Sequence, residues 1–120
     1  MNGIILIDKP KEYTSHDVVA IVKKISKEKV GHTGTLDPNA TGVLPLLIGK
    51  ATEVSKYLIN HDKTYIATLK LGIKTDTADL EGKITQEKQV PVLSKEFVTQ
   101  VLNSMIGKQT QVPPMYSAIK

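Results

Sequence analysis

The spacing of hydrophobic residues in the first part of the chain predicts a strand followed by a helix. Gly3 to Asp8 (GIILID) is a short apolar run that ends at a Lys-Pro pair, which predicts a buried strand. From Ser15 to about Ser26 the apolar residues recur with helical spacing, so this segment is expected to form an amphipathic helix. Thr14 and Ser15 offer an N-cap for this helix, and Asp17 supplies a carboxylate near its positive end.

The middle of the chain predicts further strands and a hairpin. Val43 to Ile48 is an apolar strand, and Ala51 to Leu58 can form a short helix. Apolar and polar residues alternate from Lys63 to Leu71, which predicts a strand with one buried face. The acidic, threonine-rich stretch after it is expected to be a loop, and Lys83 to Lys88 the return strand of a hairpin.

A second helix is expected in the last part of the chain. Ser94 is its N-cap and Gly107 marks its end. The final segment, 111–120 (QVPPMYSAIK), has no regular pattern. No internal repeat or linker is apparent, so the sequence predicts one unit that mixes helices and strands. The apolar stripe of the second helix consists of Phe97, Val98, Val101, Leu102 and Met105.

The composition is that of a folded protein with a mild preference for polyanions. Of the 120 residues, 40% are hydrophobic and 23% are charged, which excludes a disordered or low-complexity chain. The 16 basic residues, all of them lysines, outnumber the 12 acidic ones and give a net charge of +4. This excess favours a nucleic-acid partner without requiring one. Lysines act as point charges toward phosphate and lack the planar fork of arginine.

Several kinds of site are excluded or disfavoured by residue type. The chain has no cysteine, which excludes disulfides, thiolate nucleophiles and cysteine zinc sites. The three histidines, His16, His32 and His61, share no short ligand spacing, so no metal site is predicted. The longest apolar run, Val43 to Ile48, is too short to cross a bilayer, and no signal peptide is visible.

The segment from Gly31 to Gly42, GHTGTLDPNATG, is expected to be a long loop with a functional role. Its one carboxylate, Asp37, precedes Pro38, which biases Asp37 toward an extended backbone. The glycines of the loop allow a ligand to approach the backbone closely, and its threonines supply hydroxyl groups. The residues alone leave an ordinary alternative open, in which Asp37 and Pro38 start a turn.

Four blocks of the sequence, in order, resemble the TruB family of tRNA pseudouridine synthases. HTGTLDPNATGVLPLLIGKAT (32–52) is similar to the family signature that contains the catalytic aspartate. Three further blocks are similar to the family's other motifs and extend the resemblance over nearly the whole chain. They are GIILIDKP with TSHDVV, KTYIATLKLGIKTDTADLEG and QVPPMYSAIK. The resemblance implies an α+β fold, part of the pseudouridine synthase fold, with a largely antiparallel sheet and packed helices.

The resemblance also implies an activity and the residues that perform it. Members of the family isomerise uridine 55 in the T arm of tRNA to pseudouridine, without a metal or an organic cofactor. By its place in the motif, Asp37 is the catalytic carboxylate. Tyr65 matches the tyrosine that stacks on the target base, although alone it is equally consistent with a core tyrosine. His32 matches the histidine that helps to displace the target nucleotide, although alone it is an ordinary surface residue.

Other residues acquire weaker expectations from the same motifs. Lys9 and Pro10 would either support the catalytic loop or contact RNA, and Asp76 and Thr77 are candidates for an RNA contact. Family members are longer and carry a later arginine, which pairs with the catalytic aspartate, and a C-terminal RNA-binding domain. This chain has no arginine. Residues 1–120 are therefore expected to be the N-terminal portion of the catalytic domain, with those later parts absent and no activity alone.

The resemblance implies a monomeric cytoplasmic enzyme whose partner is tRNA, with no membrane and no metal. Two other interpretations stay open. One is a non-catalytic RNA-binding module, which would use the lysines and loops but not Asp37. The other is a relative that works within a guide-RNA particle.

Overall fold

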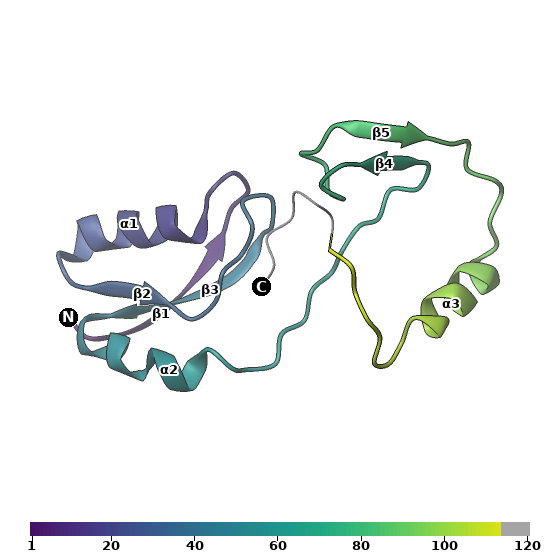
Figure 1. Cartoon of the computed structure of the whole chain (residues 1–120). Helices are drawn as coiled ribbons and strands as arrows, with labels where there is room; N and C mark the ends of the chain where they lie inside the picture. Colours follow the sequence, from purple (N-terminus) through teal and green to yellow (C-terminus); the bar gives the residue numbers. More distant parts are fainter. Residues whose placement is uncertain (114–120) are drawn as a thin grey trace. The chain divides into compact units, whose positions relative to one another are not determined.

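A computed structural model describes residues 1–113, which form two compact units. The first unit is Met1–Tyr65 and the second begins at Ile66, so the expectation of one unit is not met. Each unit is described by itself. The elements in chain order are β1 (Gly3–Lys9), α1 (Ser15–Ser26), β2 (Val30–His32), β3 (Gly42–Ile48), the 3-10 helix η1 (Gly49–Val54), α2 (Ser55–Leu58), β4 (Ile73–Thr75), β5 (Ile84–Glu87) and α3 (Lys95–Ser104) (Figure 1).

The first unit is built on a three-stranded antiparallel sheet with the order β1-β3-β2. The central strand β3 pairs along its whole length with β1, from Gly3 opposite Ile48 to Lys9 opposite Gly42. The strand predicted at 43–48 is confirmed, and it begins one residue earlier. The short helix predicted next is also confirmed, as η1 continuing into α2.

The prediction that the first strand is buried is wrong. In β1 the side chains alternate, and those of Ile4 and Leu6 are 52% and 68% exposed. Ile5 and Ile7 point to the other face and pack against the hydrophobic core. The physical reason is that β1 lies at the edge of the sheet and α1 covers only one face of it (Figure 1). An apolar run in the sequence does not show whether both faces of a strand are covered.

The helix α1 matches its predicted bounds because both of its ends are determined by local interactions. The Thr14 hydroxyl accepts a hydrogen bond from the Asp17 amide at 3.0 Å, and the Asp17 carboxylate accepts one from the Thr14 amide at 2.8 Å. These reciprocal bonds form a capping box, which satisfies free amides at the start of a helix. Lys27, with a φ of 61°, ends the helix in the left-handed region. Val18 and Val19 are buried against Leu44 and Leu46 of β3 and form the core of the first unit.

The strand predicted over Lys63–Leu71 is not formed. No regular structure is assigned to residues 61–70, and the side chains of Ile66 and Leu69 are 99% and 79% exposed. The alternating pattern was compatible with a strand, but a strand also needs a neighbour for its backbone hydrogen bonds, and a local pattern cannot supply one. The hairpin instead pairs β4 with β5, so the return strand predicted at 83–88 is confirmed with a different partner.

The second unit contains this hairpin and α3. The Ser94 hydroxyl accepts a hydrogen bond from the Phe97 amide at 3.1 Å, which confirms the predicted N-cap. The apolar stripe of α3 stays between 37% and 56% exposed, whereas α1 buries Val18 and Val19. Residues 111–113 have no regular structure, and the rest of the segment predicted to be irregular lies outside the described residues. In residues 1–113 no helix is long and apolar enough to span a membrane.

Candidate active site

The loop that carries Asp37 connects β2 to β3 at one end of the sheet in the first unit. The sequence predicted a loop from Gly31 to Gly42, but Gly31 and His32 belong to β2, where they pair with Leu47 and Leu46 of β3. Three residues of an edge strand carry too weak a pattern to be recognised from the sequence. The loop itself covers residues 33–41, and the Asp37 side chain within it is exposed.

Asp37 begins a turn, as the ordinary interpretation of the Asp-Pro pair requires. The Ala40 amide donates a hydrogen bond to the Asp37 carbonyl oxygen at 2.9 Å. Pro38 occupies the second position of this four-residue turn, where its fixed φ is favourable. The turn holds the backbone of Asp37 and leaves its carboxylate exposed. A turn and a catalytic role are therefore compatible.

Lys9 anchors the residue that follows Asp37. Its side chain is completely buried, and its ammonium group donates to the carbonyl oxygens of Pro10 at 2.8 Å, Tyr13 at 2.6 Å and Pro38 at 3.3 Å. The Glu12 amide donates to the same Pro38 oxygen at 2.8 Å. An ammonium group has three donors, so the three carbonyls satisfy it. Of the two roles open for Lys9, this geometry favours support of the loop over contact with RNA.

Ser15 anchors the residue that precedes Asp37. Its hydroxyl accepts a hydrogen bond from the Leu36 amide at 2.9 Å and donates one to the Leu36 carbonyl oxygen at 3.3 Å. Leu36 also packs its side chain against the hydrophobic core. The loop is thus bonded on both sides of Asp37, to the last residue of β1 and to the first residue of α1.

His32 is the last residue of β2 and is half-buried. Its Nδ1 lies 2.6 Å from the Gly34 carbonyl oxygen. A carbonyl oxygen can only accept, so Nδ1 carries the proton in this bond. The bond fixes the ring, and in the neutral form it leaves Nε2 as an acceptor. His32 and Asp37 therefore lie at the start and in the middle of one anchored segment.

Tyr65 is the last residue of the first unit, and its side chain is 65% exposed. The expectation that a strand would aim the ring to one side of a sheet is not met, because the strand is not formed. The alternative of a core tyrosine is also wrong, since the ring is exposed.

Two other residues at this loop have positions that the sequence did not indicate. The Lys63 ammonium lies beside Gly34, because a Cβ added at Gly34 would be 3.5 Å from Lys63 Nζ. Thr33 is buried, and its hydroxyl has no hydrogen-bond partner within the described part of the chain. No local signal distinguishes either residue from the other lysines and threonines, because both positions depend on how distant segments fold together.

The acidic loop of the second unit is bonded internally. The Asp79 carboxylate accepts hydrogen bonds from the Thr77 hydroxyl at 2.6 Å and from the Glu81 amide at 2.9 Å. These bonds lower the pKa of Asp79 below its usual value. The Asp76 carboxylate accepts a hydrogen bond from the Lys83 amide at 2.9 Å. An RNA contact by Asp76 and Thr77 stays a prediction. Within residues 1–113, no group of three or more acidic or histidine side chains is placed to hold a metal ion.

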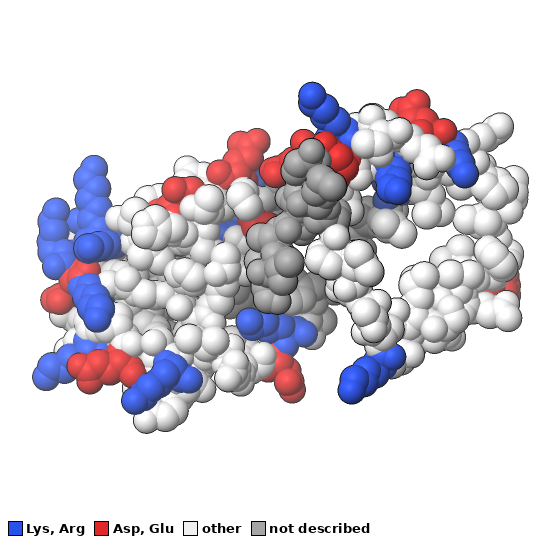
Figure 2. Space-filling view, viewed as in Figure 1, with Lys and Arg blue, Asp and Glu red and all other residues white. Residues whose placement is uncertain are grey.

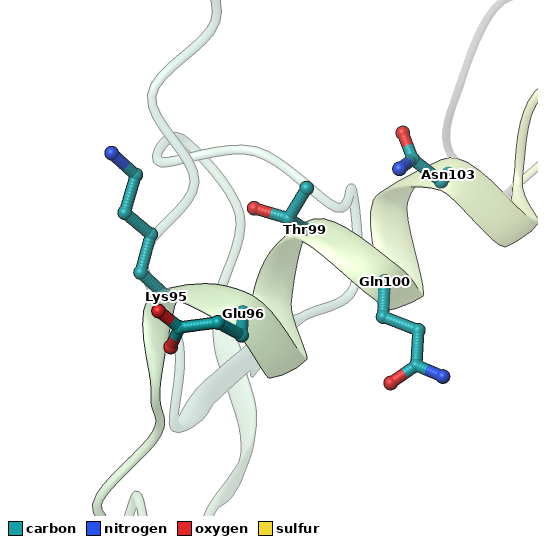
Figure 3. A pocket seen from close by; sticks show the side chains of 5 residues that line it. All are labelled: Lys95, Glu96, Thr99, Gln100 and Asn103. Atoms are coloured by element: carbon teal, nitrogen blue, oxygen red, sulfur yellow. The ribbon is translucent and has the colours of Figure 1, made fainter.

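Two surface features contain none of the predicted catalytic or substrate-binding residues. Lysines gather at the C-terminal end of α1, among them Lys23, Lys24 and Lys27, which are exposed (Figure 2). They follow Ser15 by 8 to 12 residues, which corresponds to about 12–18 Å along the helix axis. In the second unit, polar side chains of α3 line an open depression (Figure 3). Its lining contains none of the predicted site residues and consists of Lys95, Glu96, Thr99, Gln100 and Asn103.

A family model described as "TruB family pseudouridylate synthase (N terminal domain)" matches residues 22–120. The chain belongs to this family. It is 53% identical to the tRNA pseudouridine synthase B of Clostridium tetani and 48% identical to that of Francisella tularensis subsp. tularensis, in both cases over its whole length. It spans 42% and 40% of these relatives, respectively. The predicted family membership is confirmed.

A solved structure supports the fold. The chain resembles one entitled "Crystal Structure of a Cbf5-Nop10-Gar1 Complex" with a TM-score of 0.61 and 34% identity, over 98% of this chain and 31% of that one. Together with the antiparallel sheets and the helices, this match confirms the predicted α+β class. The TruB loop that carries Asp37 thus lies in a chain with the expected fold.

Proposed function

We propose that the protein containing this chain is a tRNA pseudouridine synthase that isomerises uridine 55 in the T arm of tRNA. The observation that carries the proposal is the loop around Asp37. Its carboxylate is exposed, while Leu36 and Pro38 on either side are hydrogen-bonded to buried side chains. Relatives that are 48–53% identical over the whole chain and are named tRNA pseudouridine synthase B support the same activity.

The reaction needs a group that can work at the sugar carbon of the target uridine. The N1–C1′ bond breaks, the uracil turns, and C5 forms the new bond to C1′; C5 then loses its proton to solvent and N1 gains a proton. An ionised carboxylate at position 37 can attack C1′ as a nucleophile or stabilise the positive charge that develops on the sugar. The anchored backbone would hold the carboxylate in place for either step. The sequence and the structure are compatible with both a covalent adduct and a glycal intermediate.

Substrate binding is assigned to His32 and Tyr65. The target uridine must leave the folded T loop before it can reach Asp37, which requires displacement of the nucleotide and a surface that receives the base. The fixed His32 ring, with Nε2 unused by the Gly34 bond, suits the displacement. The exposed Tyr65 ring can stack on an extruded base, since aromatic faces hold bases well.

The remaining parts of the proposal concern the whole protein. We assign residues 1–120 to the N-terminal portion of the catalytic domain, and expect an arginine that pairs with Asp37 and an RNA-binding domain elsewhere in the protein. Phosphate contacts by lysines would supply part of the affinity for tRNA. The enzyme would act as a monomer in the cytoplasm, without a metal or an organic cofactor.

A second candidate is a pseudouridine synthase that works within a guide-RNA particle. The similarity to a Cbf5 complex with Nop10 and Gar1 favours it. The two candidates differ in what the protein needs. A tRNA enzyme modifies an isolated T-arm transcript by itself, whereas a guide-dependent enzyme requires a guide RNA and partner proteins. Turnover of a T-arm transcript by the purified full-length protein would therefore decide between them.

The catalytic assignment is tested with Asp37→Asn in the full-length protein. Asparagine keeps the shape and suits the turn, but it cannot act as a nucleophile or stabilise a cationic sugar. We expect tritium release from C5-labelled uridine in a T-arm transcript to fall by several orders of magnitude. Binding of tRNA on filters should remain, because phosphate and shape contacts persist. Asp62→Asn, which neutralises an exposed carboxylate outside the loop, is the matched control. Turnover of the Asp37 variant within about tenfold of the parent would refute the role of Asp37.

A further inference from the structure

The hydroxyl group of Ser15 is hydrogen-bonded to both the amide and the carbonyl oxygen of Leu36, the residue before Asp37. The Leu36 amide donates to Ser15 Oγ at 2.9 Å, and Ser15 Oγ donates to the Leu36 carbonyl oxygen at 3.3 Å. In a β-ladder two backbones exchange a similar pair of bonds. Here one side chain replaces the second backbone, across a sequence separation of 21 residues.

Burial makes these bonds difficult to replace. Ser15 is 2% exposed, so water has little access to its hydroxyl. A buried backbone group that loses its partner costs much more than a group that can turn to water. The Leu36 carbonyl belongs to the peptide group that joins Leu36 to Asp37. The orientation of this peptide group therefore depends directly on Ser15.

Ser15 is not needed as the cap of α1. Thr14 is the N-cap, and its hydroxyl and amide complete the capping box with Asp17. Ser15 is the first residue of the helix, and its hydroxyl is bonded to Leu36 in the loop. The two adjacent hydroxyl residues therefore have separate functions. Thr14 starts the helix, and Ser15 links that start to the loop.

We propose that Ser15 is a positioning residue, which holds the Leu36–Asp37 peptide so that the carboxylate faces the target sugar in a fixed orientation. This inference rests on the proposed function, because it assigns Ser15 a role toward Asp37 as the catalytic group. Ser15 touches neither the substrate nor the reacting atoms. Its effect is expected on the chemical step, since a displacement of about 1 Å at a reacting group can cost about 100-fold in rate.

The test compares Ser15→Thr with Ser15→Val in the full-length protein. Threonine and valine have nearly the same shape, but only threonine retains the hydroxyl. We expect single-turnover rates on a T-arm transcript to be about 10- to 100-fold lower for valine than for threonine. The dissociation constant for tRNA should differ by less than about threefold, because the phosphate contacts are unchanged. Ser15→Ala is measured as well, since it cannot clash in the buried site and should behave like valine.

Two further measurements separate positioning from a loss of stability. Thr14→Ala removes the neighbouring cap and is the control for a weakened α1. Its melting temperature should fall, while its rate well below that temperature stays within about twofold of the parent. Amide hydrogen exchange of Leu36 should be at least about tenfold faster in Ser15→Val than in Ser15→Thr.

The outcomes distinguish this inference from the proposed function. If Asp37→Asn abolishes turnover and the valine and threonine variants react at equal rates, Ser15 has no positioning role although the proposed function holds. Equal rates in Ser15→Ala and the parent would overturn the inference in the same way. If Asp37→Asn remains fully active, the proposed function fails, and the role of Ser15 fails with it. A rate loss that appears equally in Thr14→Ala would identify general destabilisation as the cause and would also overturn the inference.

Discussion

Replacing Lys9 by methionine should loosen the Asp37 loop and destabilise the first unit. The change removes the buried ammonium group and retains a flexible apolar side chain of similar length. The carbonyls of Pro10, Tyr13 and Pro38 then lose a donor, at present 2.6–3.3 Å away. Pro38 keeps the bond from the Glu12 amide, so the loss falls mainly on the other two carbonyls.

The expected magnitude follows from these two carbonyls. A buried polar group without a partner costs about 1–3 kcal/mol, and these bonds are only partly buried, which favours the lower part of this range. Removal of a buried charge also removes its desolvation cost, which offsets part of the loss. We therefore expect the free energy of unfolding to fall by about 1–2 kcal/mol. Turnover should fall as well, because Pro38 lies next to Asp37 in the chain.

The assay compares Lys9→Met with Lys11→Met, which removes the same charge from an exposed position two residues away. Urea unfolding of the full-length protein gives the stability, and amide hydrogen exchange of Glu12 and Ala40 reports the loop locally. The surface variant should stay within about 0.5 kcal/mol of the parent. Equal effects of the two variants on stability and on exchange would show that the buried ammonium does not hold the loop.

Three further predictions concern other parts of the first unit. Gly49→Ala should destabilise the first unit by more than about 1 kcal/mol in urea unfolding. The glycine has a φ of 64°, and a Cβ added there would collide with Met1 and Asn2. Gly3→Ala is the control, because a Cβ added at Gly3 meets open space. The bonds from Thr14 lower the pKa of Asp17 below its usual 3.8. The parent should therefore be more stable than Asp17→Asn above pH 3.8, and this advantage should disappear as the pH falls through the lowered pKa. Unfolding measured between about pH 2 and 6 checks this prediction. Tyr65→Phe should retain more turnover than Tyr65→Leu, because stacking needs the face of the ring, and equal losses would argue against it.

The sequence predicted the parts of the first unit that local interactions determine. The helix α1 has a capping box within four residues and an apolar stripe along one face, so its bounds could be read from the chain. The strand β3 is a continuous apolar run and was equally clear. The segment 63–71 failed because alternation identifies a possible face but not a partner strand. Exposure of Ile4 and Leu6 was missed for a related reason, since the cover over a sheet face comes from distant residues.

The sequence predicted the loop of the candidate site and named Lys9 as one possible support, whereas the catalytic role of Asp37 stays a prediction. The loop around Asp37 was recognisable from its composition and from the family motif, whereas the residues that hold it are separated from it by 21 and 29 positions. The family's first motif, GIILIDKP with TSHDVV, contains Lys9 and Ser15. Residue types alone do not show that Lys9 bonds Pro38 and that Ser15 bonds Leu36. Long-range hydrogen bonds of this kind have no periodicity in the sequence.

A catalytic carboxylate on a loop requires that the loop be as rigid as a strand. Loops are usually the mobile parts of a fold, and a reacting group must be held to within about 0.5 Å. In this chain the backbone on both sides of Asp37 is bonded to Lys9, the last residue of β1, and to Ser15, the first residue of α1. The carboxylate can then be exposed to RNA without the freedom of an ordinary loop. On the proposed catalytic role of Asp37, Lys9 and Ser15 support the active site even though they supply none of the reacting groups.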